Sequence, residues 1–278
     1  MNIFNIFFRI LNRLKKELPL YFIRKTVKTT EGIIISFTSY PARLPHLHFV
    51  VRSLLRQSVH PEKIILYLGT DTNPKDIPRS LRKLTKYNFE IRTGNADIKP
   101  HKKYFFAMQE FPKKNIVTVD DDIIYHKDFL RDLYNSYRKN PDCVHARRVT
   151  KLTASNGNIN KYEKFIYKFK DELNPSHALM AIGCGGVLYP AGCFKNDDFN
   201  ISLIIKNCLN TDDIYLKFLE IKNLVKVVYV PSKYEEDLNV RNTQKTGLFH
   251  SNYESGNKND VAFENLTKVM KINIADYL

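Results

Sequence analysis

Short runs rich in β-branched and other hydrophobic residues recur along the chain and predict buried strands. They cover residues 32–37, 63–68, 115–119 and 225–230. Runs of this kind are typical of parallel strands that helices cover on both faces. Between the first two runs, from His46 to Gln57, hydrophobic positions repeat with helical spacing. Because strand, helix and strand follow one another, the sequence predicts a parallel strand pair in an α/β fold.

Weaker patterns predict the remaining elements. Helices are expected over residues 98–108, over 129–137 and from 208–215 onward, with a helix and turn over 74–87. Strands are expected over residues 89–92, 142–151 and 181–190, the last interrupted by three glycines. Glycine inside a strand marks a bulge or a close approach of the backbone to a ligand.

The first 18 residues are the most amphipathic segment of the chain. Isoleucine, leucine and phenylalanine fill one broad helical face, and arginine, lysine and asparagine fill the other. The apolar run is too short to span a bilayer, so we expect a helix in the plane of an anionic membrane surface. A helix that packs on its own domain or on a partner is the alternative. A linker-like segment follows over residues 19–31, and we assign 1–28 to the helix with its linker and 29–278 to the main domain.

Three consecutive carboxylates, Asp120, Asp121 and Asp122, follow the predicted strand 115–119. Burying an unpaired carboxylate is very costly, so these side chains belong at the open end of the strand, near water or a cation. On an extended chain Asp120 and Asp122 point to the same side, where they can hold Mg²⁺ or Mn²⁺ while phosphates supply further oxygen ligands. The alternative is a solvated turn before a helix, since acids favour both.

Two further segments carry groups suited to a phosphorylated ligand. The loop after the first strand holds Thr38, Ser39, Tyr40 and Arg43. It lies at the edge where α/β sheets bind nucleotides. Lys102 and Lys103 open a helix, where a cation opposes the macrodipole, and one of them facing a diphosphate would offset that cost. A plain turn and a solvated basic loop are the respective alternatives.

Two acids, Asp212 and Asp213, open a late predicted helix. N-capping by Thr211 or Asp212 explains one of them, and Asp213 is then a candidate general base. The helix N-terminus would lower its pKa and partial burial would raise it. Further along, His250 is a candidate third metal ligand, with an ordinary surface or core histidine as the alternative.

The chain is strongly basic. Lys and Arg number 44 against 29 Asp and Glu, a formal net charge of +15, which favours an anionic partner. The basic residues are scattered, without an arginine-rich tract or an aromatic RNA-binding motif, so no nucleic acid is expected. The four cysteines lack Cys-x-x-Cys spacing, and we expect reduced thiols in a cytoplasmic protein.

Five segments, in this order, resemble the GT-A glycosyltransferases, specifically family-2-like bacterial enzymes that build surface polysaccharide or lipooligosaccharide. They are Ile35–Arg43, Lys99–Lys103, Val119–Asp122, Gly183–Pro190 and Asp212–Ile214. The resemblance implies a GT-A fold, a Rossmann-like, mixed and mostly parallel sheet flanked by helices. It also implies a nucleotide-sugar donor and a glycan or glycolipid acceptor.

The same resemblance implies roles for particular residues. Asp120 and Asp122 would hold Mn²⁺ or Mg²⁺, with His250 as the third candidate ligand. Asp213 or Asp212 would deprotonate the acceptor hydroxyl, with inversion at the anomeric carbon. The residues implied to bind the donor are Thr38, Ser39, Tyr40, Arg43, Lys102, Lys103, Asp121, Gly185 and Gly186. The stretch Leu68–Asn73 lacks the acidic pair that many family-2 enzymes carry there, which leaves the donor's base open.

Two other classes of function stay open on the sequence. A Mg²⁺-dependent phosphotransferase or phosphatase also places aspartates after a strand, but Ile124 stands where an Asp-x-Asp-x-Thr pattern needs threonine. A non-catalytic basic protein that binds membranes or nucleic acid fits the net charge but not the two acidic clusters. For the glycosyltransferase, we expect a cytoplasmic protein held peripherally on the inner face of the cytoplasmic membrane.

Overall fold

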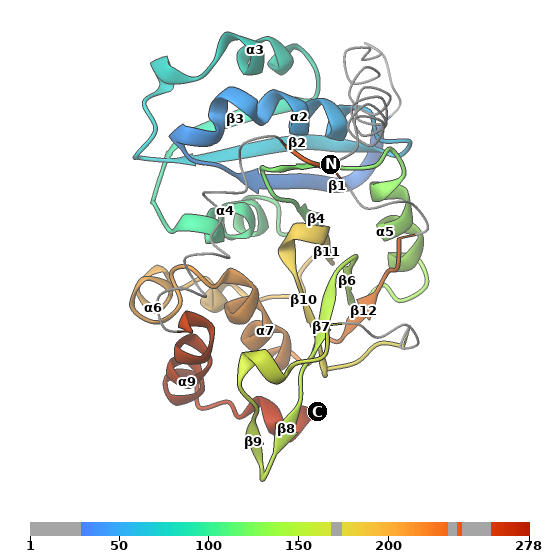
Figure 1. Cartoon of the computed structure of the whole chain (residues 1–278). Coiled ribbons are helices and arrows are strands. Elements are labelled where there is room, and N and C mark those ends of the chain that lie inside the picture. The colour runs from blue at the N-terminus through green and yellow to red at the C-terminus, as the bar shows by residue number, and fades with distance from the viewer. Residues whose placement is uncertain (1–28, 168–173, 233–237, 241–256) are drawn as a thin grey trace, which may run out of the picture.

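A mixed, mostly parallel sheet forms the centre of the molecule (Figure 1). The computed structural model describes residues 29–167, 174–232, 238–240 and 257–278. Across the sheet the strands are β12 (Val227–Tyr229), β6 (Val144–Ala146), β11 (Val187–Tyr189), β4 (Asn115–Thr118), β1 (Thr29–Thr38), β2 (His60–Gly69) and β3 (Phe89–Asn95). All neighbours run parallel except at β11, which is antiparallel to both β4 and β6. The predicted α/β fold is confirmed.

The predicted buried strands are confirmed, and β1, β2 and β4 each send side chains into the cores on both faces of the sheet. In β1, Ile33 and Ile35 face one hydrophobic core and Ile34 faces the other, all fully buried. The helix α2 (Leu47–Leu55) connects β1 to the parallel β2, as the strand–helix–strand pattern predicts.

Helices cover both faces of the sheet. On the face of Ile33 and Ile35 lie α2, α3 (Arg79–Arg82) and α5 (Phe129–Tyr137). On the face of Ile34 lie α4 (Lys102–Glu110) and α7 (Asp212–Lys222). The helix α9 (Lys258–Met270) packs against α7 and against α6 (Ile201–Asn207) on this second side.

Short antiparallel pairs and 3-10 helices complete the described chain. The pairs are β7 (Val149–Lys151) with β10 (Leu179–Ala181), β5 (Ile123–Ile124) with β13 (Leu238–Asn239), and β8 (Ala154–Ser155) with β9 (Asn158–Ile159). The 3-10 helices are η2 (Pro41–His46), η3 (Pro74–Asp76), η4 (Lys83–Lys86), η5 (Lys99–His101), η6 (Tyr162–Lys164), η7 (Gly183–Gly185), η8 (Asn196–Asp198) and η10 (Ile274–Tyr277).

Two predicted strands are wrong in extent. The strands expected over 142–151 and 181–190 are each divided between the central sheet and the β7–β10 pair. In the second case the chain leaves β10, turns through η7 and enters β11 directly after Gly186. Gly186 has a φ of +85°, which glycine adopts without strain.

Only some of the predictions for the N-terminal part fall on described residues. The amphipathic helix expected over residues 1–18 lies outside the described residues. Because β1 begins at Thr29, residues 29–31 belong to a strand and not to the linker. The four cysteines are free thiols, as predicted. Within the described residues, no helix is both long and apolar enough to cross a membrane.

Candidate active site

The acidic triplet lies at the carboxyl edge of the central sheet. The strand β4 ends at Thr118, and the buried Val119 extends it by donating its N–H to the Ser36 carbonyl at 3.2 Å. The neighbouring β1 runs parallel to β4 and ends at Thr38. The loop after β1 and the triplet therefore share the edge at which open α/β sheets bind ligands.

The backbone turns at Asp121 and Asp122 instead of continuing as an extended strand. The premise that Asp120 and Asp122 alternate along one extended chain is therefore wrong. Asp120 reaches Lys103 at the start of α4, whereas Asp121 reaches Arg43 in η2. The turn thus connects the triplet to two different elements, because Asp120 and Asp121 meet different cations.

The loop after β1 anchors Asp121. Ser39 donates its hydroxyl to Asp121 Oδ2 at 2.6 Å, and Arg43 forms an ion pair with the other oxygen. Arg43 also lies 3.3 Å from Asp122 Oδ2, and its guanidinium carbon is 5.3 Å from the centroid of the Tyr40 ring. The structure therefore brings these predicted residues of the loop and the triplet together.

Lys103 joins the triplet to the start of α7. Its ammonium lies 3.0 Å from Asp120 Oδ1 and 2.8 Å from Asp212 Oδ2, and its side chain is 6% exposed. Asp213 accepts the Gly183 N–H at 3.1 Å. A Cβ at Gly183 would lie 2.5 Å from the lysine nitrogen and 3.0 Å from Asp213 Oδ1. Segments far apart in the sequence thus place three carboxylates around one buried cation.

The two acids at the start of α7 have opposite pKa shifts. Burial raises the pKa of Asp213 well above its usual value, and the adjacent Asp212 carboxylate adds to the rise. Burial would also raise the pKa of Asp212, but the Lys103 ammonium outweighs it and lowers that pKa. Asp213 is partly exposed, whereas Asp212 is buried. Of the two candidates, the geometry therefore favours Asp213 as the group that accepts a proton.

Carboxylates outnumber the cations that pair with them at this edge. Two cations face five carboxylates: Arg43 and Lys103 against Asp120, Asp121, Asp122, Asp212 and Asp213. Burial, and then repulsion by the other two acids of the triplet, raise the pKa of Asp122 to about 6.

This donor set fits a divalent cation that a ligand helps to hold. Among the described residues, no three potential ligands are placed to hold a metal ion by themselves, and His250 lies outside these residues. Mg²⁺ and Mn²⁺ sites commonly use one or two carboxylates and complete their coordination with substrate phosphates. Asp120 and Asp122, which now contact Lys103 and Arg43, are the candidate carboxylates for this. A bound cation would offset the burial and the repulsion that raise the pKa of Asp122.

Lys102 belongs to a second charged cluster, beyond the ends of β2 and β3. Its ammonium lies 2.5 Å from Asp97 Oδ1, and the Lys99 ammonium lies 2.6 Å from the other oxygen. Burial would raise the pKa of Asp97, but the two lysines lower it to about 2. A Cβ at Gly69 would lie 2.8 Å from Asp71 Oδ1 and 3.3 Å from the Lys102 nitrogen. Lys102 and Lys103 therefore belong to different clusters, and they do not compete for the same place beside a ligand.

Three other predicted donor-binding residues have structural roles of their own. The Thr38 hydroxyl donates to a backbone carbonyl of β2 at 2.8 Å. A Cβ at Gly185 would lie 2.7 Å from the backbone nitrogen of Arg148, and a Cβ at Gly186 would lie 2.3 Å from the Phe129 ring. Close packing accounts for both glycines. Contact of these glycines with a nucleotide-sugar donor is a proposal.

Two buried side chains at this edge were not among the predicted site residues. Tyr125 accepts the Asp120 N–H at 2.9 Å and donates to the Cys184 carbonyl at 3.3 Å, which fixes the backbone of the triplet. Arg147 is 7% exposed and lies 5.6 Å from the centroid of the Phe129 ring. Its Nε and Nη1 have no hydrogen-bond partner in the described part of the chain. The basic pair within the strand expected over 142–151 was a signal for Arg147, but no pattern marks Tyr125.

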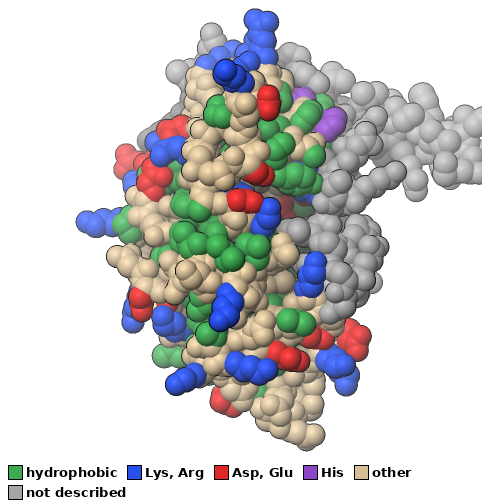
Figure 2. All heavy atoms as spheres, turned by 90° about the vertical axis from the view of Figure 1, so that its left-hand side faces the viewer, with side chains coloured by type: hydrophobic (Ala, Val, Ile, Leu, Met, Phe, Trp, Pro, Cys, Tyr) green, Lys and Arg blue, Asp and Glu red, His purple; other side chains and the backbone are tan. Residues whose placement is uncertain are grey.

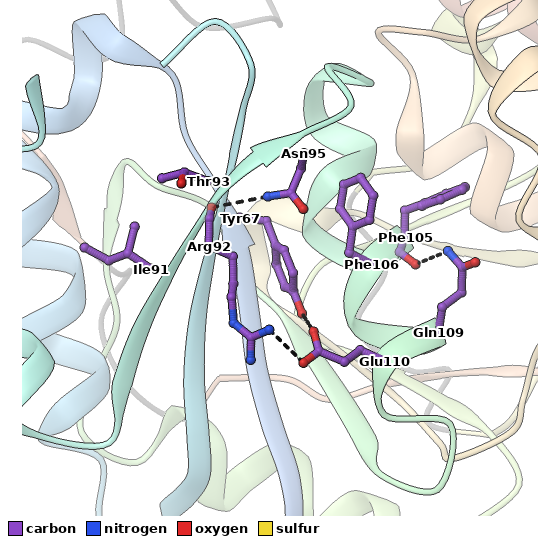
Figure 3. A pocket seen from close by; sticks show the side chains of 9 residues that line it. All are labelled: Tyr67, Ile91, Arg92, Thr93, Asn95, Phe105, Phe106, Gln109 and Glu110. Atoms are coloured by element: carbon purple, nitrogen blue, oxygen red, sulfur yellow. Dashed lines mark hydrogen bonds and ion pairs between the residues drawn. The ribbon is translucent and has the colours of Figure 1, made fainter. Parts of the chain in front are cut away.

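A separate groove of about 670 Å³ lies between β2, β3 and α4 (Figure 3). Phe105 and Phe106 supply part of its apolar lining. Its charged groups pair with each other, since Glu110 accepts the Tyr67 hydroxyl at 2.9 Å and lies 2.8 Å from an Arg92 nitrogen. No carboxylate or lysine of the two charged clusters lines this groove. It is therefore not the candidate reaction centre.

Comparisons with known proteins assign the chain to no family. No family model matches the chain, and no curated protein matches it. Among solved structures, UTP-bound UGPase from Acinetobacter baumannii is 11% identical over 89% of this chain and 100% of its own, with a TM-score of 0.41. Residues 1–349 of S. aureus TarS in complex with UDP are 13% identical over 87% of this chain and 72% of that one, with a TM-score of 0.47. The inositol-1-phosphate CTP transferase from T. maritima is 10% identical over 83% and 99%, with a TM-score of 0.44. The chain has a mixed, mostly parallel, Rossmann-like sheet flanked by helices.

Proposed function

We propose that the chain is a metal-dependent, inverting glycosyltransferase that moves a sugar from a nucleotide-sugar donor to a glycan or glycolipid acceptor. The observation that carries this proposal is the ammonium of Lys103, held between Asp120 after β4 and Asp212 in α7. Such a transfer needs positive charge at the leaving diphosphate and a base close to it. The cluster supplies the first through Lys103 and the second through Asp213, and the resemblance to GT-A enzymes supports the same assignment.

In this reaction Asp213 takes the proton of the acceptor hydroxyl. The acceptor oxygen then bonds to the anomeric carbon as the bond from that carbon to the diphosphate oxygen breaks, and the nucleoside diphosphate leaves. A divalent cation held by Asp120 and Asp122 would neutralise charge that develops on the diphosphate. Lys103 contributes a second, fixed positive charge. The raised pKa of Asp213 suits this role, because a base accepts a proton most effectively when its pKa lies near the working pH.

A thermal-shift panel of nucleotide sugars and nucleoside diphosphates tests donor binding. With Mn²⁺ present, one nucleotide should raise the melting temperature of the wild type, since a ligand of the folded state stabilises it by mass action. Asp122→Asn should lose the Mn²⁺-dependent part of this shift, and Asp142→Asn, at an exposed aspartate, should keep it. No response of the folded wild type to any nucleotide would contradict the proposal.

Product analysis tests the transfer itself. Nucleoside diphosphate should be released from the donor when acceptor is present. Asp213→Asn should still bind the donor and should turn over about 100-fold or more slowly, as expected for loss of a general base. Release of pyrophosphate from a nucleoside triphosphate and a sugar phosphate would instead identify a nucleotidyltransferase. Turnover of a plain phosphoester would identify a phosphatase.

We assign this reaction to residues 29–278 and assign peripheral membrane contact, on the inner face of the cytoplasmic membrane, to residues 1–28. The amphipathic pattern of the first 18 residues supports the second assignment. A chain that begins at Thr29 should lose this contact in a sedimentation assay with membranes. Unchanged sedimentation would show that residues 1–28 are not its cause.

A further inference from the structure

Five basic side chains form an exposed surface on the segment that connects β2 to β3. They are Lys75, Arg79, Arg82, Lys83 and Lys86, here called the basic surface. They lie on η3, α3 and η4. Figure 2 shows lysine and arginine side chains at its top, the height at which α3 stands in Figure 1.

The segment directs these cations to solvent because its apolar residues are buried. Ile77, Leu81 and Leu84 alternate with them and belong to the core that contains α2. Asp76 is the one acid within residues 75–86. The outward face of the segment is therefore almost purely positive.

The cations of the basic surface lack counter-ions among the described residues. Other surface lysines are paired: Lys63 lies 2.7 Å from Glu90, and Lys114 lies 2.7 Å from Glu62. No ion pair of this kind joins any of the five to a carboxylate in the described ranges. Five like charges within residues 75–86 repel one another, and an extended anionic partner would relieve the repulsion.

The segment favours a membrane over nucleic acid as that partner. No aromatic residue occurs from Thr70 to Lys86, and the ring of the adjacent Tyr87 packs against the core and under Lys86. The segment therefore lacks the row of open aromatic rings on which successive bases stack. The helix α3 has four residues, too short to read a major groove. A layer of anionic headgroups requires only that cations come within about 10 Å, one Debye length, of its surface.

We propose that the basic surface docks the protein on membranes that contain anionic lipids, through the headgroup phosphates. This contact is separate from the one expected of residues 1–18. The helix α3 contacts η2, which carries Arg43, so the docked face borders the loop whose Ser39 and Arg43 bind Asp121. A lipid-linked acceptor would then reach the site from the membrane surface, a step that rests on the proposed function.

Partitioning of the full chain into lipid vesicles tests the docking. One variant combines Arg79→Gln, Arg82→Gln and Lys83→Gln, and vesicles of phosphatidylcholine with about one third phosphatidylglycerol are compared with pure phosphatidylcholine. Each cation near an anionic surface strengthens partitioning about fivefold, so the triple variant should bind about 100-fold more weakly at low salt. The difference should shrink at high salt, which screens the charges.

A matched variant controls for net charge. It combines Lys161→Gln, Lys164→Gln and Lys206→Gln, three exposed lysines beside β9 and on α6, away from α3 (Figure 1). It should partition like the wild type. Equal losses in both variants, no loss in the first, or equal binding of the wild type to pure phosphatidylcholine would overturn the proposal. Lost binding of duplex DNA with unchanged vesicle binding would overturn it in favour of a nucleic-acid surface.

Turnover with a soluble acceptor, measured without lipid, separates this proposal from the proposed function. The basic-surface variant should turn over like the wild type there. Selective vesicle binding by a protein without transferase activity would refute the proposed function alone. Transferase activity without a charge-dependent loss in the triple variant would refute the docking surface alone.

Discussion

Replacing Lys103 by methionine removes the cation that Asp120 and Asp212 share and keeps a side chain of similar length. The ammonium lies 3.0 Å and 2.8 Å from the two carboxylates and is 6% exposed. Removing one partner of a buried ion pair costs about 3–5 kcal/mol, because the other partner is left without a counter-ion. Two carboxylates are left in this case, so we expect a loss in the upper part of that range.

Urea unfolding, followed by circular dichroism, measures the loss. The matched control is Lys114→Met, because Lys114 lies 2.7 Å from Glu62 but is 34% exposed. An exposed pair of this kind contributes about 0–1 kcal/mol. Equal m-values in the two variants would show that unfolding exposes the same surface in both. A loss below about 1 kcal/mol for Lys103→Met, equal to that of the control, would refute the buried bridge.

The stability lost in Lys103→Met should depend on pH, and the titration of Asp212 sets the direction of this dependence. Lys103 holds the folded pKa of Asp212 below its usual 3.8, so this pair contributes stability above that pH and loses it as the pH falls through the folded pKa. Without Lys103, burial raises the same pKa, and the folded variant loses stability as the pH rises from the usual value. The free-energy difference between wild type and variant should therefore grow from about pH 4 toward neutral pH. A difference that does not change with pH would contradict the assigned charges.

Two further variants and one pH profile test the packing and chemistry of the same edge. Gly183→Ala places a Cβ 2.5 Å from the Lys103 nitrogen; this flexible side chain can move, so stability should fall by less than about 1 kcal/mol in urea unfolding while turnover falls about 100-fold. Unchanged turnover would show that the position of the lysine does not matter. Gly186→Ala combines a φ of +85° with a Cβ 2.3 Å from the Phe129 ring, so it should lose about 2–4 kcal/mol, and a loss under about 1 kcal/mol would contradict this packing. The raised pKa of Asp213 predicts that kcat/KM falls on the acid side through a pKa well above 3.8, because a protonated carboxyl cannot act as a base; an acid limb at the ordinary value would exclude this residue as the base.

Hydrophobic patterning located the main elements because both faces of the sheet are buried. A strand covered on both faces must be apolar throughout, so residues 32–37, 63–68 and 115–119 stand out in the sequence and lie in or next to β1, β2 and β4. Helical periodicity placed α5 at residues 129–137, as the structure has it. The break around Arg147 escaped this reasoning. The three glycines of 181–190 indicated an interruption but not a change of sheet, because a short strand that changes sheet keeps the same apolar pattern.

The candidate site was partly visible for an electrostatic reason. Three acids cannot be buried unpaired, so Asp120–Asp122 had to lie at the open end of their strand. The sequence also showed which cations were near in the chain, but it did not show which cation each acid would meet. The turn at Asp121, the bond from Tyr125 and the separation of Lys102 from Lys103 all depend on elements that pack together only in the folded protein.

The sequence by itself determined the α/β class, the order of the elements and the edge at which polar groups gather, because periodicity records which side of each segment is buried. The tertiary structure decided that Lys103 lies between Asp120 and Asp212, and that Asp213 has a raised pKa. Ion pairs form at separations of about 3–4 Å between segments far apart in the chain, and the pKa of a carboxyl depends on how much water the whole fold removes from it. The local pattern of residues determines neither the ion-pair distances nor the pKa values.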